Sequence, residues 1–225
     1  MIPTRSLSLA LLLTAPLAAE AAPPSFDCAK AKLPVEKAIC RSAELSAYDV
    51  EIAQAYGRAM QNLGDPMRET LRRAQRLFVA ARNDAFGLPD DDLSGRLTDQ
   101  IAFLKSIETR GRSTVEGSWR SGLGVVEVMK KPDGSAEVLI GTADPVRARW
   151  LCDVQVDARQ VGAEWHLLLD RDMAAGWKVA LSTSGGQLTV KATPPAGAVG
   201  EPPFCGNGGT VDGDYLPVRP DESAN

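Results

Sequence analysis

The feature that most constrains the fold of this 225-residue chain is a change in the period of its apolar residues near residue 110. Before that point, apolar side chains recur every three or four positions, which is the spacing of an amphipathic helix. After it, they alternate with polar side chains, which is typical of half-buried strands. The polar segment 109–114 separates the two patterns. The sequence therefore predicts two domains, a helical one over residues 22–110 and a β-rich one over residues 115–220.

Local signals place the ends of the expected helices. Pro34 suits the first turn of a short helix, and Ser42 is a suitable N-cap for the next one. Asp65 followed by Pro66 predicts the start of a third helix. The arginines of this third helix lie mostly off its apolar stripe, so a solvated face is favoured over a basic binding face: Arg68, Arg72, Arg73, Arg76 and Arg82. The acidic residues 90–92 favour capping of a fourth helix over calcium binding, because the ligand pattern of a calcium loop is missing.

The second half contains about seven short segments of alternating polarity, separated by turns such as 132–134. Such a series predicts an antiparallel sheet closed into a barrel or folded into a sandwich. All four tryptophans lie in this half, on or near apolar strand faces, which favours core packing over a sugar-binding stripe: Trp119, Trp150, Trp165 and Trp177. The expected fold class is α+β, with a small antiparallel helical bundle followed by an antiparallel β-barrel or sandwich.

The N-terminus and the cysteines point to export. Residues 7–17 form a short apolar run after Arg5, which predicts a signal peptide over residues 1–21 rather than a membrane anchor. No cysteine follows the predicted cut directly, so we expect a periplasmic or secreted protein without a lipid anchor. Four cysteines in an exported chain indicate two disulfides. Three pairings are possible, and proximity favours Cys28–Cys40 and Cys152–Cys205, one pair per domain.

Charge is distributed unevenly along the chain. Residues 22–112 carry 14 basic and 13 acidic side chains, a net +1, whereas residues 113–225 carry 10 basic and 15 acidic ones, a net −5. An acidic second half argues against nucleic acid as the partner. It is compatible with a cationic protein partner, although a merely soluble acidic surface gives the same count.

No catalytic or cofactor-binding motif appears in the chain. The one histidine, His166, is expected on the outward face of a strand beside Glu164 and Asp170, which is too few ligands for a zinc site. A nucleophile elbow and a glycine-rich phosphate loop are both missing. Carboxylates are plentiful, but nothing singles out a pair for glycoside cleavage. We therefore expect a protein that is not an enzyme, with no metal and no cofactor.

Two blocks of the helical half resemble the N-terminal domain of LprI-type lysozyme inhibitors, over about residues 25–108. The first contains FDCAK, PVEKAIC, EL…YD and a helix ending in AxAY, and the second is LRRAQRLFVAARNDAF. The resemblance implies that the family's polar and aromatic positions hold the domain together rather than act on a substrate: Asp49, Tyr56, Gln75 and Arg82. Many family members carry a second cysteine pair where this chain has residues such as Phe86 and Leu93, so packing must replace that disulfide.

The resemblance also bears on function. It implies an exported binding protein that inhibits lysozyme or a related peptidoglycan hydrolase, through contact with a cationic protein. A non-catalytic structural or adaptor protein of the cell envelope is the first alternative. A hydrolase with an unrecognised site is the second.

Overall fold

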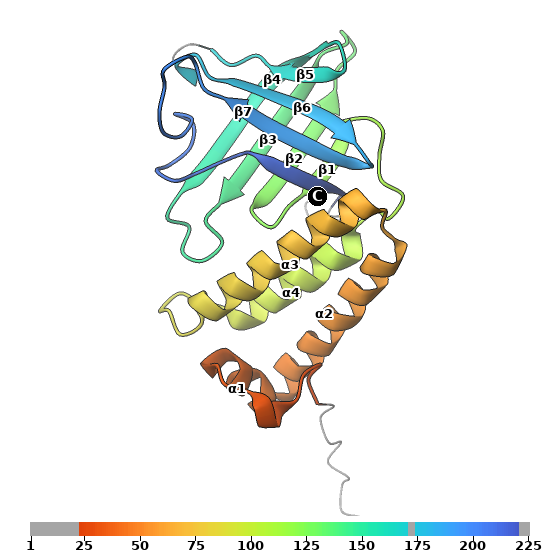
Figure 1. Ribbon diagram of the computed structural model, residues 1–225, viewed down its shortest axis with the longest axis vertical. Coiled ribbons are helices and arrows are strands. Elements are labelled where there is room, and N and C mark those ends of the chain that lie inside the picture. Colours follow the sequence, from red (N-terminus) through yellow and green to blue (C-terminus); the bar gives the residue numbers. More distant parts are fainter. Residues whose placement is uncertain (1–22, 171–173, 221–225) are drawn as a thin grey trace, which may run out of the picture.

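The computed structural model describes residues 23–170 and 174–220; the predicted signal peptide lies outside the described residues. The chain forms a helical domain and a β-barrel domain in that order (Figure 1). The helices α3 and α4 lie between the barrel and the remainder of the helical domain, and α1 is the helix farthest from the barrel (Figure 1). This α+β arrangement confirms the expected fold class. The domain boundary between residues 110 and 115 stays a prediction.

The helical domain contains a short 3₁₀ helix and four α-helices: η1 (Cys28–Lys30), α1 (Pro34–Arg41), α2 (Ala43–Asn62), α3 (Asp65–Ala85) and α4 (Leu93–Ser106). Pro34 opens α1, and the Ser42 side chain caps α2 by accepting from the Leu45 amide at 3.3 Å, both as predicted. The start of α3 differs by one residue, because Gly64 is its N-cap and Asp65 already belongs to the helix. The Asp92 side chain caps α4 by accepting from the Gly95 amide.

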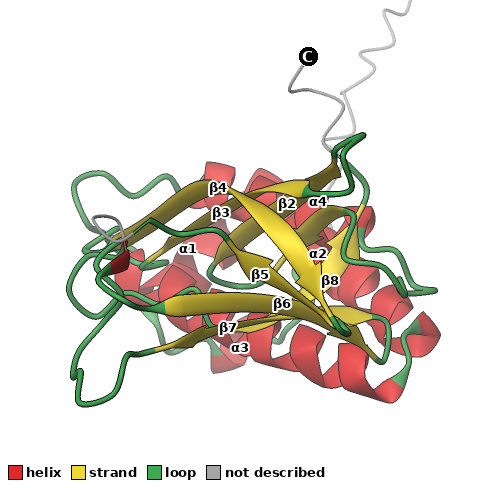
Figure 2. Ribbon diagram, turned by 90° about the horizontal axis from the view of Figure 1, so that it is seen from above, coloured by secondary structure: helices red, strands yellow, loops and turns green. Residues whose placement is uncertain are grey.

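The second domain is a closed barrel in which every neighbouring pair of strands is antiparallel (Figure 2). Of the two architectures expected from the sequence, a barrel or a sandwich, the structure has the barrel. Its eight strands are β1 (Gly117–Arg120), β2 (Gly124–Lys130), β3 (Ala136–Ala143), β4 (Leu151–Val161), β5 (Glu164–Leu167), β6 (Lys178–Ser184), β7 (Gln187–Thr193) and β8 (Gly213–Val218). The sequence suggested about seven strands and missed β1, which has only four residues. β1 is nevertheless the strand that closes the barrel, because Ser118 pairs with Val218 of β8.

Apolar side chains at every second position of the strands fill the barrel interior. Inward positions of β2 and β3 are fully buried, among them Val126, Val128 and Ile140. Trp119 and Trp165 are buried as expected, whereas Trp150 and Trp177 are only half-buried at the edge of the core. Those two tryptophans therefore combine core packing with an exposed part.

The last strand belongs to both domains. Leu216 and Val218 of β8 pack into the core of the helical domain, and Ile107, just after α4, forms a β-bridge with Val218. Polar contacts join the domains as well: the Thr70 hydroxyl donates to Gln187 Oε1 at 2.8 Å. These contacts hold the helices against the side of the barrel.

Arg112, in the linker between the domains, reinforces this junction. Its guanidinium donates to Glu108 and to the carbonyl oxygens of Ser118 and Val218, and it stacks over the Trp119 ring at 5.2 Å. One side chain therefore ties the linker to both β1 and β8.

Candidate functional site

The two ends of the barrel differ in their connections. At one end, the strands are joined by tight turns at residues 131–135, 162–163 and 185–186. At the other end, they are joined by three long segments, 144–150, 168–177 and 194–212, besides one short turn. The α3–α4 connection, residues 86–92, lies against the first of these segments. We call the described residues of these four connections the loop end: 86–92, 144–150, 168–170, 174–177 and 194–212.

The long barrel connections are joined to one another. The Cys152–Cys205 disulfide links the start of β4 to segment 194–212, with Cα atoms 4.1 Å apart. The Gly206 amide donates to the Leu151 carbonyl at 2.8 Å beside it. Gly176 packs so closely on Pro195 that a Cβ placed there would lie 3.3 Å from the proline ring. The connections therefore form one continuous surface.

The base of segment 194–212 is fixed by two hydrogen bonds. Asp212 accepts from the Ala192 amide, and the Tyr215 hydroxyl donates to the Val211 carbonyl at 2.9 Å. Burial raises the pKa of Tyr215, so this phenol keeps its proton at neutral pH and remains a donor. The 19-residue segment thus starts and ends on a rigid support.

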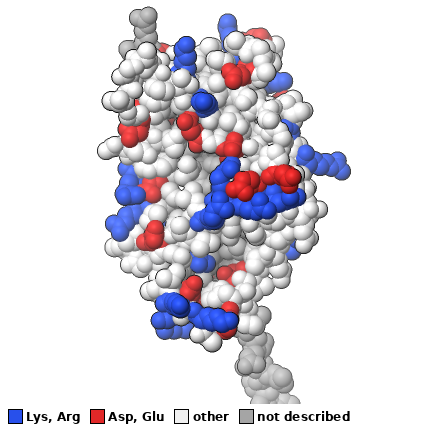
Figure 3. All heavy atoms as spheres, viewed as in Figure 1, with Lys and Arg blue, Asp and Glu red and all other residues white. Residues whose placement is uncertain are grey.

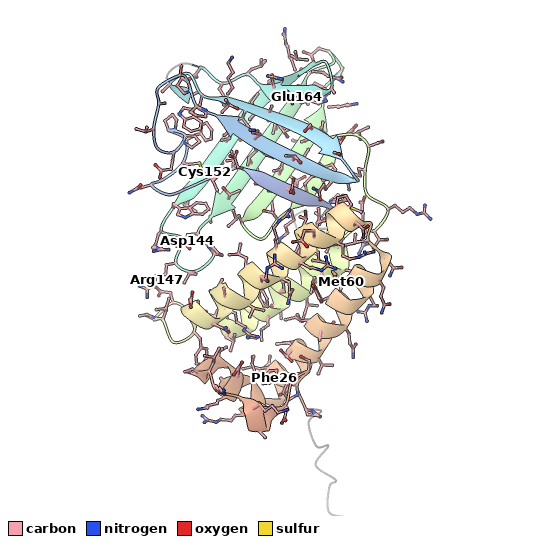
Figure 4. The ribbon with its side chains drawn as sticks, in the orientation of Figure 1. Phe26, Met60, Asp144, Arg147, Cys152 and Glu164 are labelled. Atoms are coloured by element: carbon pink, nitrogen blue, oxygen red, sulfur yellow. A yellow bond between two sulfur atoms is a disulfide. The ribbon has the colours of Figure 1, made fainter. Side chains whose placement is uncertain are left out.

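Segment 144–150 is folded around Asp144. Its buried carboxylate accepts from the amides of Val146 and Arg149 and from Arg149 Nε at 2.7 Å. The hydrogen bond with Arg149 holds the pKa of Asp144 below its usual range, and burial opposes this only in part. Figure 4 shows Asp144 and Arg147 on the side of the molecule that also carries Cys152, away from Glu164.

Two residues of the loop end adopt a left-handed backbone that favours glycine. Ala148 has φ of 48° and Ala175 has φ of 47°, and among the described residues they are the non-glycine positions with positive φ. Such strained positions persist only where surrounding contacts enforce them, and they cluster at functional sites. Both lie in the loop end and neither lies in the helical domain.

A groove runs between the helical domain and segment 144–150. Its two adjoining cavities measure about 530 and about 400 Å³ and share the lining residues Asp90, Arg96 and Pro145. Arg96 spans the groove: it pairs with the buried Asp91 at 3.2 Å and donates to the Pro145 carbonyl at 2.9 Å. This contact sets the distance between the two walls.

Three large apolar side chains in or next to the barrel connections of the loop end are exposed. Val199, in segment 194–212, is 96% exposed, and Leu151 and Leu168 are 59% and 48% exposed. Half-buried aromatic rings lie behind them: Trp150, Trp177 and Phe204. Aromatic side chains at the edge of a core are typical of protein-binding surfaces.

The loop end is also acidic. Its described residues include seven acidic and two basic side chains, a net −5, whereas the three tight turns at the opposite end carry one lysine and one aspartate, a net charge of zero. Three of these acidic side chains, residues 90–92, come from the α3–α4 connection and the other four from the barrel connections, so both domains contribute to the negative charge of the loop end.

The exposed face of α3 is a second charged region, but its charges are paired. Figure 3 shows a band of basic and acidic side chains across the middle of one face of the molecule. On α3, Arg72 and Arg76 both pair with Glu69, at 3.2 and 3.4 Å, and Arg73 pairs with Asp214 of β8 at 2.7 Å. This arrangement is the solvated face that the sequence favoured, rather than an unbalanced basic surface.

Two arginines of α3, Arg68 and Arg82, do not belong to this solvated face. Arg68 is half-buried and donates to the carbonyl oxygens of Met60 and Leu63.

Arg82 is buried, its Nε and Nη2 donate to Asn83 Oδ1, and burial lowers its pKa against the attraction of Asp49 and Glu36. Asp49 is buried too and accepts from the amide and the hydroxyl of Ser25. These two charged groups therefore lie inside the helical domain, facing protein rather than solvent.

The other family-motif residues also face the interior of the helical domain. Gln75 Oε1 accepts from Gln100 Nε2 at 2.8 Å, which joins α3 to α4, and Tyr56 packs on the helical core. The structure thus distributes Asp49, Tyr56, Gln75 and Arg82 over the packing contacts of α2, α3 and α4 and brings none of them to the loop end. Their role in holding the domain together stays a prediction.

The cysteines pair as proximity favours. Besides Cys152–Cys205, Cys28 is joined to Cys40, with Cα atoms 5.9 Å apart, which attaches η1 to α1. His166 lies partly exposed on β5, with Nε2 3.1 Å from Glu164. Within residues 23–170 and 174–220, no three acidic, histidine or cysteine side chains are arranged to hold a metal ion. No helix in the same residues is long and apolar enough to cross a membrane.

Sequence reasoning missed the loop end as a site. The length of the connections between strands could have indicated this site. Segment 194–212 is far longer than an ordinary strand connection and contains four prolines. Its proximity to residues 86–92 depends on how the domains pack, which no local pattern reports.

Comparison with known proteins confirms the resemblance of the N-terminal region. Residues 28–118 match the family model described as Lysozyme inhibitor LprI. The match extends beyond the expected limit near residue 108, through the linker and into β1. Searches of curated proteins and of solved structures found no match.

Proposed function

We propose that this chain is an exported, non-catalytic protein that inhibits lysozyme or a related peptidoglycan hydrolase. The observation that carries the proposal is the match of residues 28–118 to the LprI lysozyme-inhibitor family. The family name supports a lysozyme as the class of partner. The charge and the exposed apolar side chains of the loop end support the binding of such a partner.

Charge supports a basic partner. Lysozymes of the c type are strongly basic, and the loop end carries a net −5. Opposite charges over such a surface steer the encounter and raise the association rate more than they raise the affinity. Affinity then depends on packed apolar contacts, which the exposed Val199, Leu151 and Leu168 offer.

The test is a turbidity assay of bacterial cell walls with a c-type lysozyme and micromolar protein lacking residues 1–21. We expect slower lysis in the presence of the protein, and no muropeptides released by the protein alone. The inhibition should weaken as the salt concentration rises, since the Debye length falls to about 10 Å at 0.1 M.

Two results would change the proposal. Failure to inhibit any lysozyme class at micromolar protein would favour the envelope adaptor. Muropeptides released without added lysozyme would favour a hydrolase.

A further inference from the structure

We infer that residues 196–200, the tip of segment 194–212, enter the substrate cleft of the hydrolase, while the acidic loop end rests on the basic surface around that cleft. The inference rests on the proposed function and adds the surface and the contact that would produce inhibition. It follows from four properties of the tip: projection, rigid support, neutrality and small size.

The tip projects into solvent without a partner of its own. Val199 is 96% exposed, the largest exposure among the large apolar side chains of the described residues. An exposed valine on a loop contributes nothing to the core of its own protein. Long loops mounted on a rigid scaffold are where binding residues concentrate.

The support of the tip is rigid. Prolines flank it on both sides, at 194–195 and 202–203, and the Cys152–Cys205 disulfide anchors its second arm to β4. Within the loop, the Ala198 amide donates to the Pro195 carbonyl at 3.0 Å, and Glu201 accepts from the Gly208 amide at 2.9 Å. A loop held in this way loses little conformational entropy on binding, which favours affinity.

The tip is chemically suited to a glycosidase cleft. Such clefts contain a pair of carboxyl groups on either side of the scissile bond. Residues 196–200 are Ala-Gly-Ala-Val-Gly, so they introduce neither a like charge nor a bulky side chain between those carboxyl groups. None of the acidic side chains of the loop end belongs to the tip: Glu201 directly follows it, and the others lie elsewhere on the loop end, where they would meet the basic outer surface of the enzyme.

The aromatic residues complete the surface. Trp150, Trp177 and Phe204 pack on the barrel core and are half-buried around the base of the loop. Tryptophan is among the residues enriched in binding hot spots, so Trp150 and Trp177 can supply contact area around the tip. The opposite end of the barrel also exposes two apolar side chains, Met129 and Val161, but its tryptophan, Trp165, is buried.

A matched pair of substitutions tests the tip. Val199→Asp places a carboxylate on the tip, and Val161→Asp makes the same change at the end of β4, next to the opposite turn, where valine is 59% exposed. We expect Val199→Asp to raise the Kd for c-type lysozyme at least tenfold and to relieve inhibition of lysis. Val161→Asp should change both quantities less than twofold, and thermal unfolding of both variants should match that of the wild-type chain.

Competition tests the cleft. A chito-oligosaccharide that fills the lysozyme cleft should displace the wild-type protein, with the apparent Kd rising in proportion to the oligosaccharide concentration. Equal binding with and without saturating oligosaccharide would overturn insertion into the cleft.

The results separate this inference from the proposed function. If the wild-type chain inhibits lysozyme but Val199→Asp inhibits equally well, or both aspartate variants weaken inhibition alike, the inference alone is wrong. If the wild-type chain neither binds nor inhibits any lysozyme, the proposed function is wrong and the inference fails with it.

Discussion

The two domains achieve stability by different means. The barrel interior is filled by large apolar side chains such as Trp119, Ile140 and Leu181, each fully buried. The helical domain also has fully buried large side chains, such as Ile39, Leu71 and Leu97, but it adds small residues such as Ala55 and Ala59 between its helices and buries charged groups at Asp49 and Arg82. A domain of this size has a small core and needs additional stabilisation. Here this comes from a disulfide, from polar contacts between helices, and from two residues of β8.

This comparison teaches that the helical domain is incomplete on its own. Leu216 and Val218 are covalently part of the barrel, yet they pack in the helical core. The family match also continues past α4 into β1. The core of the helical domain therefore includes residues outside the segment with helical periodicity.

Removal of the disulfides should cause the largest losses of stability, and each removal should destabilise mainly one of the two domains. Replacing Cys152 and Cys205 together by serine should cost the barrel about 4 kcal/mol, because the disulfide closes a segment of 53 residues. Replacing Cys28 and Cys40 together should cost the helical domain about 3 kcal/mol, because that loop spans only 12 residues. Tryptophan fluorescence reports the barrel, which contains all four tryptophans, and circular dichroism at 222 nm reports the helices.

If each double variant changes both signals equally, the domains unfold as one unit and the division between them is wrong. Urea unfolding under non-reducing conditions is the appropriate measurement. Wild-type protein treated with reductant is the control for the loss of both disulfides.

Leu216→Ala should cause the next largest loss of stability, and this loss should affect both domains. The side chain is fully buried where β8 meets the helices, so its truncation should cost about 3 kcal/mol. Both the fluorescence and the dichroism transitions should move to lower urea. Leu181→Ala, at an equally buried position of the barrel core, is the control and should move mainly the fluorescence transition. An unchanged dichroism transition in Leu216→Ala would show that the helices do not depend on β8.

Arg82→Ala should produce a smaller loss, confined to the helical domain. It removes buried contacts and leaves the Asp49 carboxylate buried without an attracting cation, at a cost of about 2 kcal/mol. Arg72→Ala, on the exposed face of the same helix, should change stability by less than about 0.5 kcal/mol. Thermal unfolding measures both. If Arg82→Ala unfolds like the wild-type chain but no longer binds lysozyme, Arg82 is a binding residue and not a structural one.

Much of the fold could be predicted from the sequence, because its signals are local. The proline at 34, the serine at 42 and the alternation along β2 to β4 each depend on residues a few positions apart. Closure of the barrel could not be predicted in this way, since it depends on Ser118 pairing with Val218 across a hundred positions. Nor could the burial of Arg82 be predicted, because Arg72, Arg73 and Arg76 of the same helix are exposed.

The loop end could not be predicted as a site for a related reason, since it depends on contacts between segments that are distant in the sequence. The local pattern at residues 90–92 indicates only a helix cap, and the prolines and glycines of residues 194–203 indicate only a loop. Asp92 does cap α4, so the local interpretation was correct but incomplete. The arginine that brings these acidic residues next to segment 144–150, Arg96, makes its contact 49 positions away, at Pro145.

Because β8 contributes to the cores of both domains, it affects the order in which the chain folds. The helices are synthesised first, but the contact between Thr70 and Gln187 spans 117 positions and Val218 lies near the end of the described chain. Contacts of such high sequence separation form late, because the intervening chain must lose its entropy first. A nascent chain stopped before residue 213 would therefore present both an open barrel and an uncovered helical face. We expect such intermediates to be the aggregation-prone species of this protein, and the last six-residue strand to remove both exposed surfaces in one step.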